Sequence, residues 1–162
     1  MAADGRALPD AVPVGISFFF SLVVRHTDAV PRLRVSSGTS WETLAGFSRG
    51  MRAGTRVCIS GTTATASDGT CVGGTDVVAQ TTFALDIIEA SLKSLGATLA
   101  DVVRTRIFVR NVDDWEAAAR AHGARFGQVK PANTLVEAKL VGDEYLVEIE
   151  AEVCTPWVEP MV

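Results

Sequence analysis

Apolar residues recur at helical spacing between residues 77 and 95, and this stripe is the clearest pattern in the chain. It comprises positions 77, 81, 84/85, 88, 92 and 95, where the threonine at 81 contributes a methyl group. The spacing predicts one long amphipathic helix that begins at Thr75 or Asp76, either of which can cap it, and ends at Gly96. One face of this helix must be buried against a flat surface.

Runs rich in β-branched residues on both sides of the helix supply that surface. We expect strands at 57–61 and 104–109, and a short strand at 33–36. Residues 51–56 predict a strand, a turn and a second strand around Gly54, whereas 41–49 and 62–75 are expected to be loops, the first packed over the sheet.

A second helix is expected from Asp113 or Asp114 to Phe126. Its predicted apolar face contains a single histidine and consists of Trp115, Ala118, Ala119, His122 and Phe126. Pro131 prevents the helix from continuing, and two further strands are predicted at 133–140 and 145–153, on either side of a turn at 142–143.

The predicted order of elements is β-β-α-β-α-β-β. Two helices on one face of a mixed sheet give a two-layer α+β domain. We assign this single domain to residues 34–162. Residues 1–33 are expected to be an accessory N-terminal extension, for which three interpretations remain open: a degenerate targeting peptide, a translated upstream extension, or an apolar arm that docks on the domain or on a neighbouring subunit.

The last predicted strand alternates strictly between acidic and apolar side chains. Glu148, Glu150 and Glu152 lie on one face, while the other face consists of Val147, Ile149, Ala151 and Val153. Three carboxylates in such a row usually form a solvated face, which is the ordinary interpretation of Glu148.

Composition narrows the possible partners. A chain of 162 residues fits one domain, and a net charge of −4 with a pI near 5.1 leaves no basic footprint, so we expect no nucleic-acid partner. The apolar run 12–24 is too short to span a bilayer, and no membrane partner is expected. The three cysteines form no C-x-x-C pair and indicate free thiols in a reducing compartment; we expect a cytoplasmic protein without a metal site, although organelle targeting by the extension stays open.

Several short motifs, taken in order, resemble the RidA/YjgF family of reactive-intermediate deaminases. They are I-S-G at 59–61, Q-T at 80–81, L-x-x-x-G-A-x-L-x-D-V-V at 92–103, T-x-I-F-V at 105–109, P-A-N-T at 131–134 and L-V-E-I-E-A at 146–151. The resemblance covers roughly residues 46–153. It implies the compact fold shared with the small trimeric type of chorismate mutase, a homotrimer with ligand clefts between subunits, and no cofactor.

The deaminase members of that family hydrolyse reactive enamines and imines to keto acids and ammonia. Their signature arginine, which grips the substrate carboxylate through two charge-assisted hydrogen bonds, corresponds to Asn133 here. The family's pocket tyrosine corresponds to Phe47, and its helix asparagine to Ala119. Glu148 matches the glutamate that positions the attacking water.

The resemblance therefore gives a candidate site with Glu148 and His122 as catalytic residues and Phe47, Arg49 and Asn133 as substrate-binding residues. Arg49 could replace the missing arginine from another direction, but a surface arginine that binds nothing is the simpler interpretation. Likewise, a lone histidine such as His122 is more often a core residue than a catalyst.

Two functions from different classes follow. The first is a RidA-like protein that binds a small carbonyl, enamine or imine metabolite in an intersubunit cleft, with deaminase-type hydrolysis as its reaction if it is an enzyme. The alternative is a non-catalytic trimeric module for ligand sensing or protein interaction that has lost the deaminase activity.

One further motif, G-F-S-R-G at 46–50, fits the G-x-S-x-G nucleophile elbow of the α/β-hydrolases. That elbow requires a strand before the serine and a helix after it. We expect a strand after Ser48 instead, so this interpretation is disfavoured.

Overall fold

The computed structural model describes residues 21–25, 30 and 32–156. Its elements are β1 (Ser21–Arg25), β2 (Arg32–Ser36), α1 (Ser40–Ala45), β3 (Gly50–Ala53), β4 (Arg56–Thr62), α2 (Val77–Ser94), β5 (Val102–Val109), α3 (Trp115–Phe126), β6 (Ala132–Glu137) and β7 (Val147–Cys154). Short 3₁₀ turns precede β5 and α3, at Leu99–Asp101 and Val112–Asp114. Residues 12–20 of the apolar N-terminal run, and with them most of the predicted extension, lie outside the described residues.

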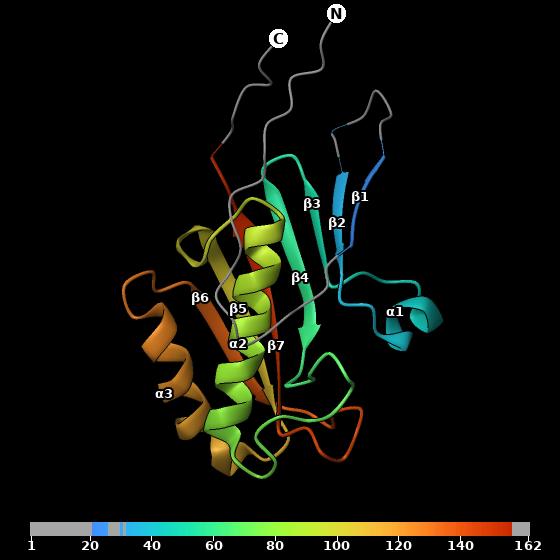
Figure 1. The fold of residues 1–162 in the computed structure, drawn as a ribbon. Coiled ribbons are helices and arrows are strands. Elements are labelled where there is room, and N and C mark those ends of the chain that lie inside the picture. The colour runs from blue at the N-terminus through green and yellow to red at the C-terminus, as the bar shows by residue number, and fades with distance from the viewer. Residues whose placement is uncertain (1–20, 26–29, 31, 157–162) are drawn as a thin grey trace, which may run out of the picture.

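Within the described residues, seven strands form one mixed sheet in the order β1-β2-β3-β4-β7-β5-β6. All neighbours are antiparallel except β5 and β6, which run parallel and are joined through α3. The helices α2 and α3 lie side by side across one face of this sheet, whereas α1 lies apart at the β2 end (Figure 1). This arrangement confirms the two-layer α+β fold.

The core forms between α2 and the sheet, as the stripe predicts. Every position of that stripe is buried, and Leu85, Ile88 and Leu92 are completely inaccessible to solvent. Each such side chain contributes roughly 1.5–3 kcal/mol when it leaves water. The Asp76 carboxylate caps the helix by accepting hydrogen bonds from the backbone amides of Val78 and Ala79, and Gly96 follows its C-terminus with a φ of 69°.

Three expectations about elements are wrong. Residues 40–45 form α1 rather than a loop. The strands β6 and β7 do not pair around the turn at 142–143, because β5 lies between them in the sheet. Trp115 does not belong to the buried face of α3: its side chain is 53% exposed, whereas Ala118 and Phe126 are buried.

The sheet extends beyond the predicted domain boundary. β1 lies within the segment assigned to the extension and pairs antiparallel with β2, from Ser21 opposite Ser36 to Arg25 opposite Arg32. None of the helices in the described part of the chain is long and apolar enough to cross a membrane.

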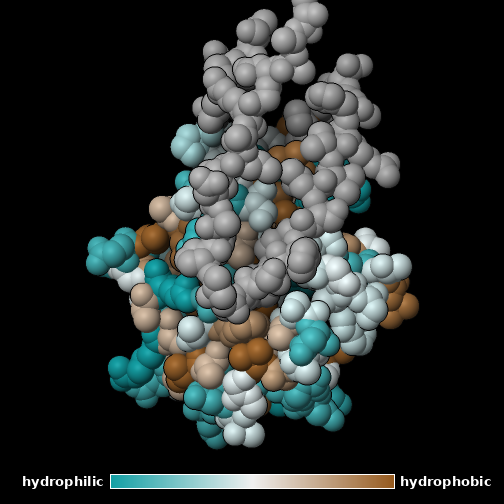
Figure 2. Space-filling view, in the orientation of Figure 1, coloured by the Kyte–Doolittle hydropathy of each residue, from teal (hydrophilic) through white to brown (hydrophobic). Residues whose placement is uncertain are grey.

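Surface hydropathy is mixed on the helix side. Figure 2 shows a hydrophobic spot at the edge of the molecule where α1 lies. On that helix Leu44 is 79% exposed and Trp41 is 55% exposed. The apolar side chains of α1 therefore do not contribute to the protomer's core.

Candidate functional site

The two faces of the sheet differ in what covers them. Thr105, Ile107 and Val109 of β5 are buried beneath the helices, and the alternation of a strand sends the intervening side chains to the opposite face. On β7 that opposite face carries the three glutamates, as predicted. In the described part of the chain no helix covers this second face, which we call the uncovered face (Figure 1).

Glu148 is the unpaired carboxylate of the row on β7. Arg106 of β5 holds Glu150 and Glu152, at 2.9 and 2.8 Å. Among the described residues, Glu148 has no hydrogen-bond or ion-pair partner, although it is half-buried. Burial, together with the charge of Glu150, raises the pKa of Glu148 above its usual value, against the opposing attraction of Arg49.

Gly61 explains how this carboxylate fits against β4. The pairing between β4 and β7 is irregular between Ile59 and Thr62, and the Glu148 side chain lies directly over Gly61. A Cβ atom at Gly61 would overlap Glu148 Oε1 and lie only 2.9 Å from its Cδ. The glycine of the I-S-G motif therefore provides the space that the glutamate occupies.

Arg49 lies just before β3, on the same face, and it is 91% buried from solvent with 9% exposed. Its Nη1 donates to the carbonyl oxygen of Ser60 at 3.1 Å, to the carbonyl of Gly61, and to Thr62 Oγ1 at 2.8 Å. Burial lowers the pKa of Arg49, while Glu42 and Glu148 counteract that effect. The expectation of a surface arginine that binds nothing is wrong.

The remaining donors of Arg49, Nε and Nη2, have no hydrogen-bond partner among the described residues. The guanidinium carbon also lies 5.8 Å from the centre of the Phe47 ring, within the range of a cation–π interaction. Arg49 and Glu148 thus attract each other electrostatically without forming an ion pair, and both keep free polar atoms.

Glu42 fixes α1 beside this cluster, and the sequence pattern gave no sign of it. Its carboxylate accepts hydrogen bonds from Ser36 Oγ, from Ser37 Oγ at 2.6 Å and from the Ser37 amide at 2.8 Å. Burial raises the pKa of Glu42, but these hydrogen bonds and the charge of Arg49 together outweigh it, so the pKa is lowered overall.

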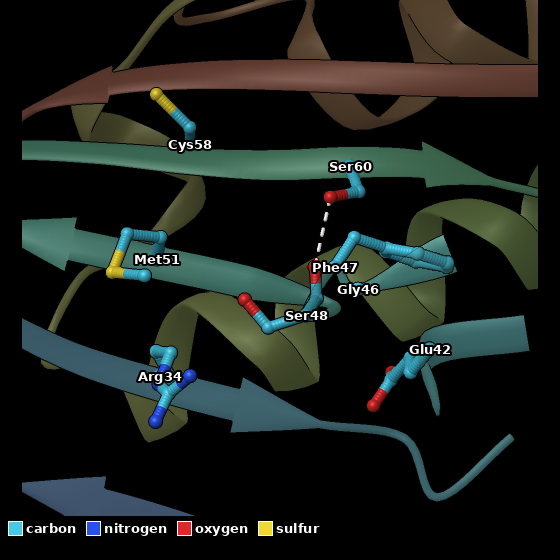
Figure 3. A pocket seen from close by; sticks show the side chains of 8 residues that line it. All are labelled: Arg34, Glu42, Gly46, Phe47, Ser48, Met51, Cys58 and Ser60. Carbon is cyan, nitrogen blue, oxygen red and sulfur yellow. Dashed lines mark hydrogen bonds between the residues drawn. The ribbon is translucent and has the colours of Figure 1, made fainter. Parts of the chain in front are cut away.

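A surface pocket of about 490 Å³ lies beside the cluster, on the uncovered face. Residues of β2, β3 and β4 line it, together with residues of α1 and of the loop that follows, which we call the α1 segment (40–48) (Figure 3). They are Arg34, Glu42, Gly46, Phe47, Ser48, Met51, Cys58 and Ser60. The hydroxyl of Ser60 donates to the carbonyl of Ser48 at 2.8 Å, which ties the loop after α1 to β4.

His122 and Asn133 belong to a different network, on the helix side. Thr105 Oγ1 lies 2.9 Å from His122 Nε2 and accepts a hydrogen bond from Asn133 Nδ2 at 2.9 Å. The imidazole also packs on the Phe126 ring, with 4.6 Å between centroids. Burial lowers the pKa of His122 and so favours the neutral imidazole.

The structure therefore divides the five predicted site residues into two groups. Phe47, Arg49 and Glu148 lie together on the uncovered face, whereas His122 and Asn133 lie across the sheet from them. The strand register explains this division. Asn133 lies opposite Thr105, whereas Glu148 lies opposite Phe108, which is three residues further along β5 and therefore on the other face.

The disfavoured nucleophile-elbow interpretation also fails on geometry. Ser48 follows α1 and precedes β3, the reverse of the required order, and its hydroxyl donates to the carbonyl of Gly50. His122, the histidine of the described region, hydrogen-bonds Thr105 instead. No cluster of three potential metal ligands occurs within the described residues, and Cys58, Cys71 and Cys154 are free thiols.

Comparisons with known proteins assign this chain to a family. The model of the Endoribonuclease L-PSP family matches residues 38–155. An uncharacterised protein of Streptomyces coelicolor, SCO2049, is 35% identical over 120 residues, which is 74% of this chain and 89% of that protein.

Solved structures agree. Rv2704 of Mycobacterium tuberculosis, described as a member of the YjgF/YER057c/UK114 family, is 42% identical, with a TM-score of 0.70 over 76% of this chain and 99% of that chain. The yjgF gene product of Escherichia coli is 26% identical, with a TM-score of 0.61 over 67% of this chain and 87% of that chain. With the family model spanning most of the chain, this protein belongs to the RidA/YjgF family.

Proposed function

We propose that this protein binds a small carbonyl, enamine or imine metabolite on the uncovered face of its sheet and hydrolyses the enamine or imine to a ketone or keto acid and ammonia. One observation carries the proposal. Glu148 is a half-buried carboxylate without a partner among the described residues, beside a buried arginine whose Nε and Nη2 are free. Such unpaired, perturbed groups are typical of functional sites.

The chemistry requires a base and a donor. An enamine first becomes the imine by taking a proton from solvent on its β-carbon and releasing one from its nitrogen. Water then adds to the carbon of the C=N bond as Glu148 takes its proton and the nitrogen takes a proton from solvent, which gives the amino alcohol. Glu148 returns its proton to the amino nitrogen, the C–N bond breaks with its electron pair leaving on ammonia, and the hydroxyl proton goes to solvent as the C=O bond forms. Glu148 holds the water as acceptor and base, while Nε and Nη2 of Arg49 stabilise negative charge that develops on the substrate.

Assembly completes the cleft. We propose that three subunits associate through their uncovered faces, so that each site is bounded by a neighbour. The family resemblance supports this arrangement, and so do Phe108 and Val136 on the open sheet face, since neighbouring apolar side chains on a surface are typical of interaction sites.

The test is keto-acid release from enzymatically generated 2-aminoacrylate and 2-iminobutyrate. Wild type should accelerate release over the spontaneous reaction, and Glu148→Ala should lose this acceleration by about 100-fold or more, the usual contribution of a general base. No acceleration by folded wild type would refute hydrolysis as its native reaction.

The second candidate function is a ligand-binding module without catalysis. Asn133 favours it, because this residue brings no charge and its amide is engaged with Thr105 at 2.9 Å. In that case keto acids or related carbonyl compounds would bind to wild type, and turnover would match the uncatalysed rate in wild type and Glu148→Ala alike.

A further inference from the structure

Arg34 is the feature of the pocket that the proposed mechanism does not use. It belongs to β2, where it lies opposite Met51 of β3, and its side chain lines the pocket at the end away from α1 (Figure 3). The family model begins at residue 38. This wall of the pocket therefore comes from a strand outside the matched region.

The Arg34 guanidinium has no hydrogen-bond or ion-pair partner among the described residues, although it is half-buried. The hydroxyl groups of the two serines in the pocket already donate hydrogen bonds within the protein. Ser60 Oγ donates to the carbonyl of Ser48, and Ser48 Oγ donates to the carbonyl of Gly50. Arg34 is thus the one side chain in the described lining with strong donors free for a ligand.

The carboxylate in the pocket does not compete for this guanidinium. Glu42 accepts hydrogen bonds from both Ser36 and Ser37, and its charge is attracted to Arg49. No ion pair between Glu42 and Arg34 exists in the structure. The pocket therefore combines a satisfied anion at one end with an unsatisfied cation at the other.

Apolar side chains also line the pocket. Met51 and Phe47 line the pocket, and a volume of about 490 Å³ suits a small metabolite. A planar carboxylate matches the fork of a guanidinium through two parallel hydrogen bonds, and a short hydrocarbon chain matches the thioether and the ring.

We infer that Arg34 anchors the carboxylate of the ligand, and that the pocket formed by β2 and the α1 segment selects small carboxylic acids over their neutral counterparts. The inference rests on the proposed function for the carbonyl or imine end of the ligand. In this inference Arg34 of β2 supplies the positive charge that Asn133 lacks.

Arg34 and the Glu148 carboxylate lie on the same face of the sheet. Arg34, Met51, Ser60 and Glu148 belong to four successive strands, β2, β3, β4 and β7, which are spaced about 4.8 Å apart. Ser60 lines the pocket and directly precedes Gly61, the position over which the Glu148 side chain lies. The pocket that contains Arg34 is therefore next to the Glu148 cluster.

Calorimetric titration tests this assignment with stable ligands. The probes are 2-oxobutyrate and its neutral amide, added to full-length wild type, Arg34→Gln, Arg34→Lys and Arg32→Gln. Arg32 is the matched control, because it lies two residues earlier on the same strand and face, is exposed, and does not line the pocket. Circular dichroism establishes that each variant is folded.

Wild type should bind the keto acid at least tenfold more tightly than the amide, and Arg34→Gln should lose about 10- to 100-fold for the keto acid alone, as for a charged hydrogen-bonded pair of roughly 1.5–3 kcal/mol. Arg34→Lys should recover part of the loss, and Arg32→Gln should stay within about twofold of wild type. Equal losses in Arg34→Gln and Arg32→Gln, or no preference of wild type for the acid, would overturn the inference.

The same variants separate this inference from the proposed hydrolysis. Glu148→Gln should abolish turnover while keto-acid binding remains. If keto-acid binding depends on Arg34 but wild type shows no turnover, the proposed hydrolysis is wrong and the role of Arg34 stands. If turnover occurs with the same KM in Arg34→Gln and Arg32→Gln, the role of Arg34 is wrong and the hydrolysis stands.

Discussion

At the scale of single residues, the site depends on how Glu148 and Gly61 share space. Glutamate side chains on the open face of a strand usually extend into solvent or pair with a neighbour, as Glu150 and Glu152 do with Arg106. Glu148 instead lies over the one position of β4 that has no side chain. The position of this carboxylate is therefore set by the absence of a Cβ atom on the neighbouring strand.

Replacing Gly61 with alanine tests this steric relationship. The new Cβ would overlap the Glu148 carboxylate, so we expect a loss of about 1–3 kcal/mol in the free energy of unfolding and a loss of keto-acid release. Urea denaturation of Gly61→Ala in wild-type and Glu148→Ala backgrounds measures the coupling. The cost should largely disappear in Glu148→Ala.

Gly123→Ala is the control for this experiment. A Cβ at Gly123, within α3, would meet no atom within 4 Å, so alanine there should stabilise the protein by about 0.5–1 kcal/mol through helix propensity. A cost at Gly61 that persists without Glu148 would show that the clash involves other atoms.

The raised pKa of Glu148 predicts a pH dependence with a definite sign. The folded state binds this proton more tightly than the unfolded state, so the contribution of Glu148 to stability is greatest below the unfolded pKa of 4.5 and declines as pH rises through the folded value. Glu148→Gln should therefore gain stability relative to wild type at pH 8 compared with pH 4. Denaturation curves at the two pH values measure this, and an advantage that is larger at pH 4 would contradict it.

At the scale of elements, periodicity predicted the parts of the fold that are determined locally. The stripe of α2 and the alternation of β7 both specify a buried face, and both are confirmed. Periodicity did not predict the neighbours of β7. The position of β5 between β6 and β7 depends on long-range pairing within the whole sheet. α1 was missed because it has only six residues, and its large apolar side chains, Trp41 and Leu44, are exposed, so no buried apolar face marks the helix.

The candidate site also has features that the local sequence predicts and features that depend on long-range packing. That Glu148 shares a face with Glu150 follows from strand alternation, but nothing local showed that Arg49 is buried or that its guanidinium turns toward the carbonyls of β4. Likewise, the apolar face of α3 predicted a buried His122, whereas its bond to Thr105 depends on how α3 packs against β5.

The contact between α3 and the sheet should depend on pH through His122. Its pKa is lowered by burial, so the unfolded state binds the proton more tightly, and stability should fall as pH decreases below the unfolded value of 6.5. In His122→Gln this part of the pH dependence should be absent. Thermal denaturation between pH 5 and 8 measures it; a slope that is unchanged in His122→Gln would assign the effect to other groups.

At the scale of the whole molecule, we expect neighbouring subunits to cover the uncovered face. Light scattering should give a mass three times that of the 17.1 kDa subunit. Val136→Lys, on the uncovered face of β6, should reduce this mass, because the lysine would be buried between subunits. Val78→Lys is the matched control, since Val78 on α2 is 44% exposed and Val136 is 43% exposed. A monomeric wild type, or equal effects of the two lysines, would contradict the trimer.

We expect hydrolysis at the Arg49 and Glu148 cluster and a structural role for the His122 network. Keto-acid release from 2-iminobutyrate by Glu148→Gln and His122→Gln, measured side by side on folded protein, distinguishes these roles. We predict that Glu148→Gln loses at least about 100-fold in kcat/KM while His122→Gln remains within about threefold of wild type. Retained activity in Glu148→Gln, or its loss in a fully folded His122→Gln, would overturn this assignment of roles.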